Sequence, residues 1–161
     1  MKPLARLEIP GLEVAVRDAA RADLPALLSM LADDQLGATR DAPGDDSGPY
    51  LAAFEAIERD PAHRLLVCEH AGQVIAMLQL SLIPGLSRRG AWRAQIEAVR
   101  TQADYRGRGV GKKFLQWCIG YARSQGCSLV QLTTDKSRAD AHRFYAGLGF
   151  TASHDGMKLQ L

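Results

Sequence analysis

The chain is a series of segments whose apolar residues recur either at every second position or at every third and fourth position. The first spacing is typical of a half-buried strand and the second of an amphipathic helix. Residues 12–17 alternate and predict a strand. Residues 24–31, preceded by the candidate N-cap Asp23, and residues 49–58 have helical spacing. Residues 37–48 between these helices are polar and rich in Gly, Pro and Asp, which predicts a loop.

After this point the pattern contains more strands than helices. Two apolar runs flank Ala71-Gly72, which is a turn signature of a β-hairpin. These two runs are predicted strands at 65–69 and 74–80. The elements predicted after them are, in order, a strand at 92–101, a helix at 114–123 closed by Gly126, a strand at 129–133, a helix at 140–148 and two short strands within 150–161. The order predicts one α/β (α+β) domain with a mixed sheet of about seven strands flanked by four helices.

Composition narrows the class of protein. The 161 residues are 47% hydrophobic and 24% charged, as expected for a single globular domain, and contain no internal repeat. The net charge is only +2, so no field favours a nucleic acid or a membrane surface, and neither is expected as a partner. No metal is expected, because the histidines lack ligand-like spacing.

The three cysteines, Cys68, Cys118 and Cys127, form no CxxC motif. This scatter argues for a reducing compartment, and buried apolar packing is the expected role of all three. Charges within the first eight residues argue against a signal peptide, and no apolar run approaches the ~20 residues of a membrane span. The expected location is the cytoplasm.

A glycine-rich basic loop stands between the strand at 92–101 and the helix that follows. Three glycines in Arg106-Gly107-Arg108-Gly109-Val110-Gly111 allow a ligand to approach the main chain, and the N-terminus of the next helix attracts anions. The loop therefore indicates a pyrophosphate cradle, although a tight turn with solvated basic residues would look similar. It is no P-loop, because Lys113 stands where Ser or Thr is needed, and it lacks the third glycine of a dinucleotide fingerprint.

Two motifs together resemble the GNAT superfamily of acyl-CoA-dependent N-acetyltransferases. The first is an Arg/Gln-x-x-Gly-x-Gly pattern, met here by Arg106, Gly109 and Gly111. The second, at 140–150, is similar to Ala-x-x-Phe-Tyr-x-x-x-Gly-Phe. The resemblance covers about 14–161 and implies a single N-acetyltransferase domain, residues 1–161 with a core of about 12–161. It also implies a mostly antiparallel sheet in which the strands at 92–101 and 129–133 splay apart.

The same resemblance implies acetyl-CoA as the co-substrate. Its pantetheine arm would hydrogen-bond the main chain of Val99, Arg100 and Thr101. Its phosphates would meet the glycine loop, at Arg106, Gly107, Arg108, Gly109, Val110, Gly111 and Lys112. Arg138 stands where the family often has an asparagine, and a cation there suits a phosphate of coenzyme A.

Acyl transfer to an amine needs a base for the amine and an acid for the departing thiolate. Tyr145 matches the tyrosine that serves as this acid in many family members, and its neighbour Phe144 is expected to face the core instead. Glu97 is the carboxylate of the strand at 92–101 and the candidate base. It is expected to share a face with Gln95, Val99 and Thr101. A substrate-binding anion, a structural ion pair or a base acting through water are alternative roles for Glu97.

His154 precedes Asp155-Gly156, a two-residue hairpin signal between the last two predicted strands. The matching turn borders the acceptor site in the family, so His154 is a candidate substrate-binding residue and a rival base. An exposed histidine without a role is the alternative.

The acceptor is expected to be a small primary amine, because residues 133–154 are similar to bacterial small-amine acetyltransferases. Acidic residues at 33, 34, 45 and 46 would suit a cationic amine, although loop acids are more often simply solvated. Arg88, Arg89 and Arg93 would instead suit an anionic group. A protein or peptide N-acetyltransferase and a non-catalytic acyl-CoA-binding sensor are the alternatives. A homodimer is a further expectation from the family.

Overall fold

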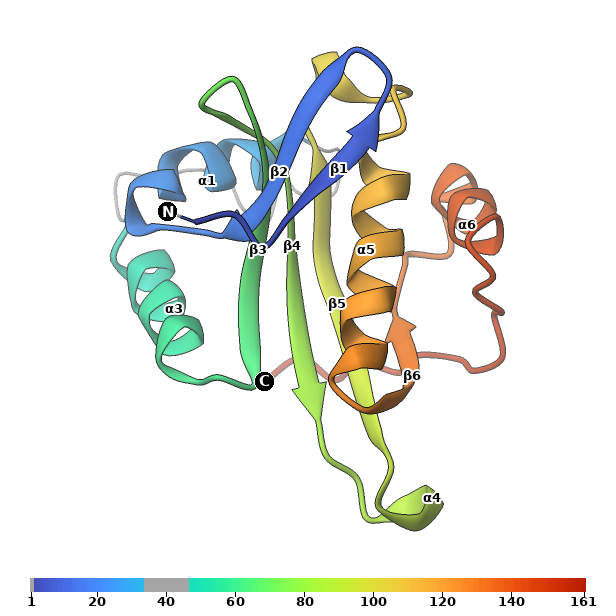
Figure 1. The fold of residues 1–161 in the computed structure, drawn as a ribbon. Coiled ribbons are helices and arrows are strands. Elements are labelled where there is room, and N and C mark those ends of the chain that lie inside the picture. The colour runs from blue at the N-terminus through green and yellow to red at the C-terminus, as the bar shows by residue number, and fades with distance from the viewer. Residues whose placement is uncertain (1, 34–46) are drawn as a thin grey trace.

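The computed structural model describes residues 2–33 and 47–161, whose strands form one six-stranded sheet in sequence order, β1-β2-β3-β4-β5-β6 (Figure 1). All neighbours are antiparallel except β5 and β6, which run parallel. The strands are β1 (Ala5–Ile9), β2 (Leu12–Asp18), β3 (His63–His70), β4 (Gln73–Ile83), β5 (Trp92–Thr101) and β6 (Cys127–Leu132). The predicted mixed, mostly antiparallel α/β fold is confirmed.

Helices cover both faces of this sheet. The helices of the described residues are α1 (Leu24–Ala32), α3 (Gly48–Arg59), the single turn α4 (Ser87–Gly90), α5 (Val110–Ser124) and α6 (Ala139–Ala146), with short 3-10 turns at Arg21–Asp23 and Ala103–Tyr105. Helix α5 crosses one face, α1 and α3 lie on the other, and α6 follows the edge strand β6 (Figure 1). We call these the α5 face and the α1/α3 face.

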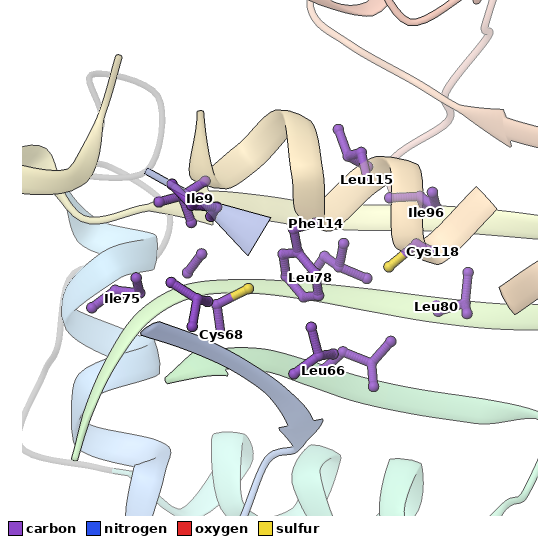
Figure 2. Packing of buried hydrophobic residues seen from close by; sticks show 14 of the residues in the cluster. Ile9, Leu66, Cys68, Ile75, Leu78, Leu80, Ile96, Phe114, Leu115 and Cys118 are labelled. Atoms are coloured by element: carbon purple, nitrogen blue, oxygen red, sulfur yellow. The ribbon is translucent and has the colours of Figure 1, made fainter. Parts of the chain in front are cut away.

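Each face has its own apolar core. On the α5 face, Phe114 and Leu115 of α5 lie over Leu78 and Ile96 of the sheet (Figure 2). On the α1/α3 face, a smaller cluster joins α1 and α3 to β3 and β4, through Leu27, Met30, Phe54, Val67 and Met77. Burying apolar area stabilises a fold by about 25 cal/mol per Å², so these two layers fix the sheet against its helices.

Local signals explain most of the element boundaries. The β3–β4 hairpin turns at Ala71 and Gly72, whose φ values of 47° and 78° are the positive angles that a tight hairpin turn requires. Gly126 follows α5 with φ 83°, as its predicted role in ending that helix demands. The predicted helices and the strands from 65 to 133 are all present, with boundaries shifted by a few residues.

The two ends of the sheet differ from the prediction. Strand β1 precedes the first predicted strand and pairs with β2, which brings Ile9 into the core. Residues 150–161 contain no strand, so the prediction of two strands there is wrong and the count is six rather than seven. Alternation alone cannot hold a strand without a face to bury, and Met157 and Leu159 are 96% and 87% exposed. The loop predicted at 37–48 lies mostly outside the described residues.

Within the described part of the chain, the hydropathy and length of every helix fall short of what crossing a membrane requires.

Candidate functional site

Strands β5 and β6 stop pairing before β5 ends, and we call the edge of β5 beyond this point the slot. Their parallel register runs from Trp92 and Cys127 to Ile96 and Leu132, where β6 ends. Strand β5 continues to Thr101 while it stays paired with β4. Within the described residues, β6 therefore does not pair with residues 97–101, where the Val99 and Thr101 carbonyl oxygens accept hydrogen bonds from the Arg100 and Arg106 side chains at 2.9 and 3.0 Å. These residues include Val99, Arg100 and Thr101, the predicted pantetheine contacts.

A β-bulge lies within this open stretch. Ala98 and Val99 together stand opposite Leu78 of β4, and Ala98 has φ 52°, which is unusual for a residue other than glycine. The bulge reverses the alternation of side chains beyond it. Val99 packs into the cluster on the α5 face, whereas Ala98 packs into the cluster on the α1/α3 face.

The bulge corrects one prediction about Glu97. Glu97 pairs with Gln79 and lies on the α1/α3 face, as does Gln95, which pairs with Ser81. Val99 and Thr101 face the opposite side, so the expectation that they share a face with Glu97 is wrong. A regular strand would have kept them together, and the inserted residue Ala98 prevents it. Glu97 is exposed and lies directly beyond the last rung that joins β5 to β6.

The glycine loop leads from β5 into α5 and exposes the helix N-terminus. Gly107 and Gly109 have φ values of 72° and 86°, and Gly109 is the N-cap of α5. The first-turn amides have no carbonyl one turn earlier in the helix, and the N-cap residue Gly109 has no side chain that could cap them. The first turn lies beside the end of β5, because a side chain on Gly111 would begin 3.5 Å from the Thr101 hydroxyl oxygen. Such a terminus stabilises an anion, and Lys112 and Lys113 add exposed positive charge.

The two arginines of the loop make different contacts. The Arg106 guanidinium donates to the Thr101 carbonyl oxygen at 3.0 Å and pairs with the Asp33 carboxylate, at the end of α1, at 2.7 Å. Arg108 stacks over the Tyr105 ring, with its guanidinium carbon 5.4 Å from the ring centre. Arg106 therefore links the end of β5 to the end of α1, a contact that the sequence pattern did not predict.

Tyr145 lies on α6 and packs against the α5-face core. Its ring contacts Phe150 edge-on, with centres 5.9 Å apart. Burial raises the pKa of the Tyr145 phenol above its ordinary value, while the positive charges of Arg138 and Arg100 oppose this rise. The phenol is therefore protonated at neutral pH and can donate a proton.

The expectation that Phe144, rather than Tyr145, faces the core is wrong. Phe144 is 37% exposed, and its ring lies against the first turn of α5, 3.7 Å from where a side chain on Gly111 would begin. Tyr145 is the more buried of the two. The reason is that α6 follows the edge strand β6 and presents Tyr145, with Leu148, toward the main core.

The remaining predicted residues are less closely associated with the slot. His154 is exposed and contacts Ser153 through Nδ1 at 2.8 Å. The hairpin expected after it is absent, and Asp155 makes an exposed ion pair with Lys136 at 3.4 Å. Arg138 is the N-cap residue of α6 and acts electrostatically on Tyr145. Cys68 and Cys118 are buried core residues, as predicted, and burial raises the pKa of both thiols.

One polar contact beside the slot went unnoticed in the sequence pattern. The Gln131 side-chain amide of β6 donates to the Gln95 side-chain oxygen of β5 at 2.7 Å. These two residues form the rung next to the last one, on the same face as Glu97. A single glutamine within the apolar run Leu129-Val130-Gln131-Leu132 was the available signal.

Comparisons with known proteins agree with this geometry. A model of the acetyltransferase (GNAT) family matches residues 25–150. An aminoalkylphosphonate N-acetyltransferase of Salmonella typhimurium strain LT2 is 32% identical over 109 residues, which cover 68% of this chain and 70% of that protein. An L-methionine sulfoximine/L-methionine sulfone acetyltransferase of Pseudomonas paraeruginosa is 29% identical over 153 residues, with 88% and 83% covered.

Solved structures share the whole architecture. A protein described as a transcriptional regulator from Bacillus halodurans C-125 superposes with a TM-score of 0.86 at 42% sequence identity, covering 92% of this chain and 99% of that one. The family model spans most of the chain, and the relatives named above are acetyltransferases. The chain therefore belongs to the acetyltransferase (GNAT) family and is an acyltransferase.

Proposed function

We propose that this protein moves the acetyl group of acetyl-CoA to the primary amine of a small molecule, with both substrates bound at once. The observation that carries the proposal is the position of two groups about the slot. Glu97 lies on the α1/α3 face, directly beyond the last β5–β6 rung, and Tyr145 packs against the core on the α5 face. A base and an acid on opposite sides of a thioester match the two ends of an acyl transfer.

The cofactor would use the slot and the helix N-terminus together. The pantetheine arm would extend along the open edge at Val99, Arg100 and Thr101, where β6 has already ended. The pyrophosphate would lie on the amides from Arg106 to Lys112, at the positive end of the α5 dipole. Arg138 would add a cation near the same ligand. The thioester then reaches the point where the strands part.

The reaction on this arrangement is a single addition and elimination. The amine nitrogen attacks the thioester carbonyl carbon, the new N–C bond forms, and the amine proton passes to Glu97 or to a water that Glu97 holds. The C–S bond then breaks, and Tyr145 donates its phenol proton to the departing thiolate. Solvent returns a proton to Tyr145 and removes one from Glu97. The products are the acetamide and free coenzyme A.

A small acceptor is favoured over a protein by the relatives. The two named above act on an aminoalkylphosphonate and on methionine derivatives, both of them small amines. Their reactions are of the class that this site would perform, and the chain covers more than two thirds of each relative.

The test is calorimetric titration with acetyl-CoA, followed by release of free thiol across a panel of amines. The panel holds amino alcohols, aminophosphonates, amino acids, aminoglycosides and lysine peptides. We expect binding of acetyl-CoA and turnover with at least one small amine. Turnover confined to the peptides would contradict the small-molecule acceptor, and binding without any turnover would indicate a sensor.

A further inference from the structure

A row of polar side chains crosses four adjacent strands beside the slot. His63 of β3, Ser81 of β4, Gln95 of β5 and Gln131 of β6 are partners in successive registers, so they lie side by side across the sheet. All four are on the α1/α3 face, the face that carries Glu97. We call them the polar row.

Hydrogen bonds hold the two ends of the polar row. His63 Nδ1 and Ser81 Oγ are 2.8 Å apart, and the Gln131 amide donates to Gln95 at 2.7 Å. Ser81 is nearly fully buried, whereas Gln95 and Gln131 are half-buried and lie nearer the slot. Ser81 is therefore the most buried member of the row, and the Gln95–Gln131 pair forms the half-buried end next to the slot.

The glutamine pair keeps hydrogen-bonding capacity after its internal bond. A primary amide has two N–H donors and an oxygen with two lone pairs. The internal bond uses one donor of Gln131 and one lone pair of Gln95. A second contact, from Gln95 Nε2 to the Ile96 carbonyl oxygen, is long at 3.5 Å. The pair thus presents both donors and acceptors, without formal charge, to whatever lies above it.

The position of the pair relates it to the acceptor amine. Gln95 is two residues before Glu97 on the same face, about 6.6 Å along the strand at 3.3 Å per residue. If the nitrogen of an acceptor amine lies at Glu97, an oxygen three or four bonds from that nitrogen would reach the side-chain amides of Gln95 and Gln131.

We propose that Gln95 and Gln131 select the acceptor, and that the substrate class is a small primary amine with a hydrogen-bonding oxygen three or four bonds from its nitrogen. This inference rests on the proposed function. It excludes simple alkyl and arylalkyl amines as good substrates, because they would cover the two amides without offering them a hydrogen-bonding partner.

The experiment compares 3-amino-1-propanol with n-butylamine, which has a methyl group in place of the hydroxyl, alongside the full amine panel. For the wild-type enzyme we expect at least a tenfold higher kcat/KM for the amino alcohol. In Gln131→Met, which keeps side-chain length but removes the hydrogen bonds, the preference should fall below threefold, mainly through a raised KM for the amino alcohol. The KM for acetyl-CoA should stay unchanged.

Gln116→Met is the matched control, because Gln116 is exposed on α5 and the chemical change is the same. Melting temperatures identify any variant that fails to fold, and Gln95→Met then serves as the second test of the pair. Three results would overturn the inference and leave the proposed function standing. The wild type could use both amines equally, the preference could stay unchanged in the folded variant, or turnover could be confined to panel amines without such an oxygen. No turnover of any amine by the wild type removes both.

Discussion

Glu97 and Val99 are two positions apart on β5 but face opposite sides of the sheet, because Ala98 and Val99 share the place opposite Leu78. In a regular strand, residues two apart share a face. The bulge therefore lets one short stretch serve two purposes. The Glu97 carboxylate is on the α1/α3 face, and the Val99 side chain packs into the α5-face core.

The first prediction concerns the backbone angle that makes this bulge. Ala98 adopts φ 52°, where alanine is strained and glycine is not. Ala98→Gly should leave the free energy of unfolding within about 1 kcal/mol of the wild type, since relief of strain offsets the lost methyl packing. Ala98→Val should cost about 2 kcal/mol or more, because a β-branched residue tolerates this angle poorly.

Urea denaturation of the two variants measures this difference. The turnover rate should also fall more in Ala98→Val than in Ala98→Gly, because a bulge displaced by valine moves Glu97 relative to the slot. Equal stability of the glycine and valine variants would show that the positive φ does not persist in solution.

The second prediction concerns the proposed base. Glu97→Gln keeps the shape of an exposed side chain but cannot accept the amine proton. We expect kcat to fall by roughly 10²-fold or more, the lower end of what a positioned general base contributes. The KM for acetyl-CoA should not change. Glu58→Gln on α3, also an exposed carboxylate, is the control and should retain wild-type kinetics. Wild-type turnover in Glu97→Gln would return the role of base to His154 or to solvent.

Sequence patterns predicted most of the fold because the relevant forces are local and periodic. The β3–β4 hairpin, the buried face of α5 and the glycine at its N-cap all follow from spacing and turn chemistry. The C-terminal strands were predicted from alternation and a turn signal, but neither signal reveals whether a partner strand is within reach. Residues 150–161 pair with no strand of the described residues.

The site was predicted less completely for a related reason. The motifs located the glycine loop and Tyr145, but a bulge depends on how β5 registers with β4, which no single segment records. The same holds for the polar row, whose members are distant in sequence and meet only through the register of four strands. The contact between Arg106 and Asp33 likewise joins residues 73 positions apart.

The third prediction concerns Tyr145 and pH. Tyr145→Phe keeps the ring contact with Phe150, so the melting temperature should change little. The rate of acyl transfer should fall roughly 10²-fold, because the thiolate loses its proton donor. Burial raises the pKa of Tyr145 despite the positive charges of Arg138 and Arg100. A phenolate cannot donate, so the wild-type rate should decline only above pH ~10.

The pH–rate profile of the phenylalanine variant should lack this alkaline limb. A profile with the limb intact in Tyr145→Phe would assign that ionisation to another group. Release of thiol from acetyl-CoA, followed with a chromogenic reagent in single-turnover mode, isolates the chemical step from product release.

The fourth prediction separates binding from backbone strain at the glycine loop. Gly109 and Gly72 have similar φ values, 86° and 78°, and a methyl group on either would meet none of the described residues within 4 Å. Alanine at either position should therefore cost about 1 kcal/mol of stability by strain alone. Only Gly109→Ala alters the N-cap that orients the first amides of α5, so its dissociation constant for acetyl-CoA should rise about tenfold, equal to roughly 1.4 kcal/mol. Calorimetric titration of both variants checks this, and equal affinities would remove the helix N-terminus from the cofactor site.

The last prediction concerns an ion-pair network that holds the start of α1 against the sheet. Arg17 of β2 pairs with Asp23 at 2.6 Å and with Glu69 of β3 at 2.7 Å, and only 13% of the Asp23 side chain is exposed. Burial alone would raise the pKa of Asp23, but hydrogen bonds from Arg17 and the Ala20 amide outweigh it and lower the pKa.

Because the pKa of Asp23 is lower in the folded protein than its ordinary value of 3.8, the ionised carboxylate stabilises the fold at pH values above 3.8. This contribution is lost as pH falls through the lowered pKa. Asp23→Asn should therefore cost about 1–3 kcal/mol at pH 7, as for a part-buried charged hydrogen bond. As pH falls below 3.8 and through the lowered pKa, the stabilities of the variant and the wild type should converge, because the wild type then loses its carboxylate. Urea denaturation at pH 7 and at pH 3 tests this, with Asp140→Asn on the exposed surface of α6 as the control. A stability difference that persists undiminished at low pH would assign the effect to packing rather than to charge, and Asp23 would then hold α1 by shape alone.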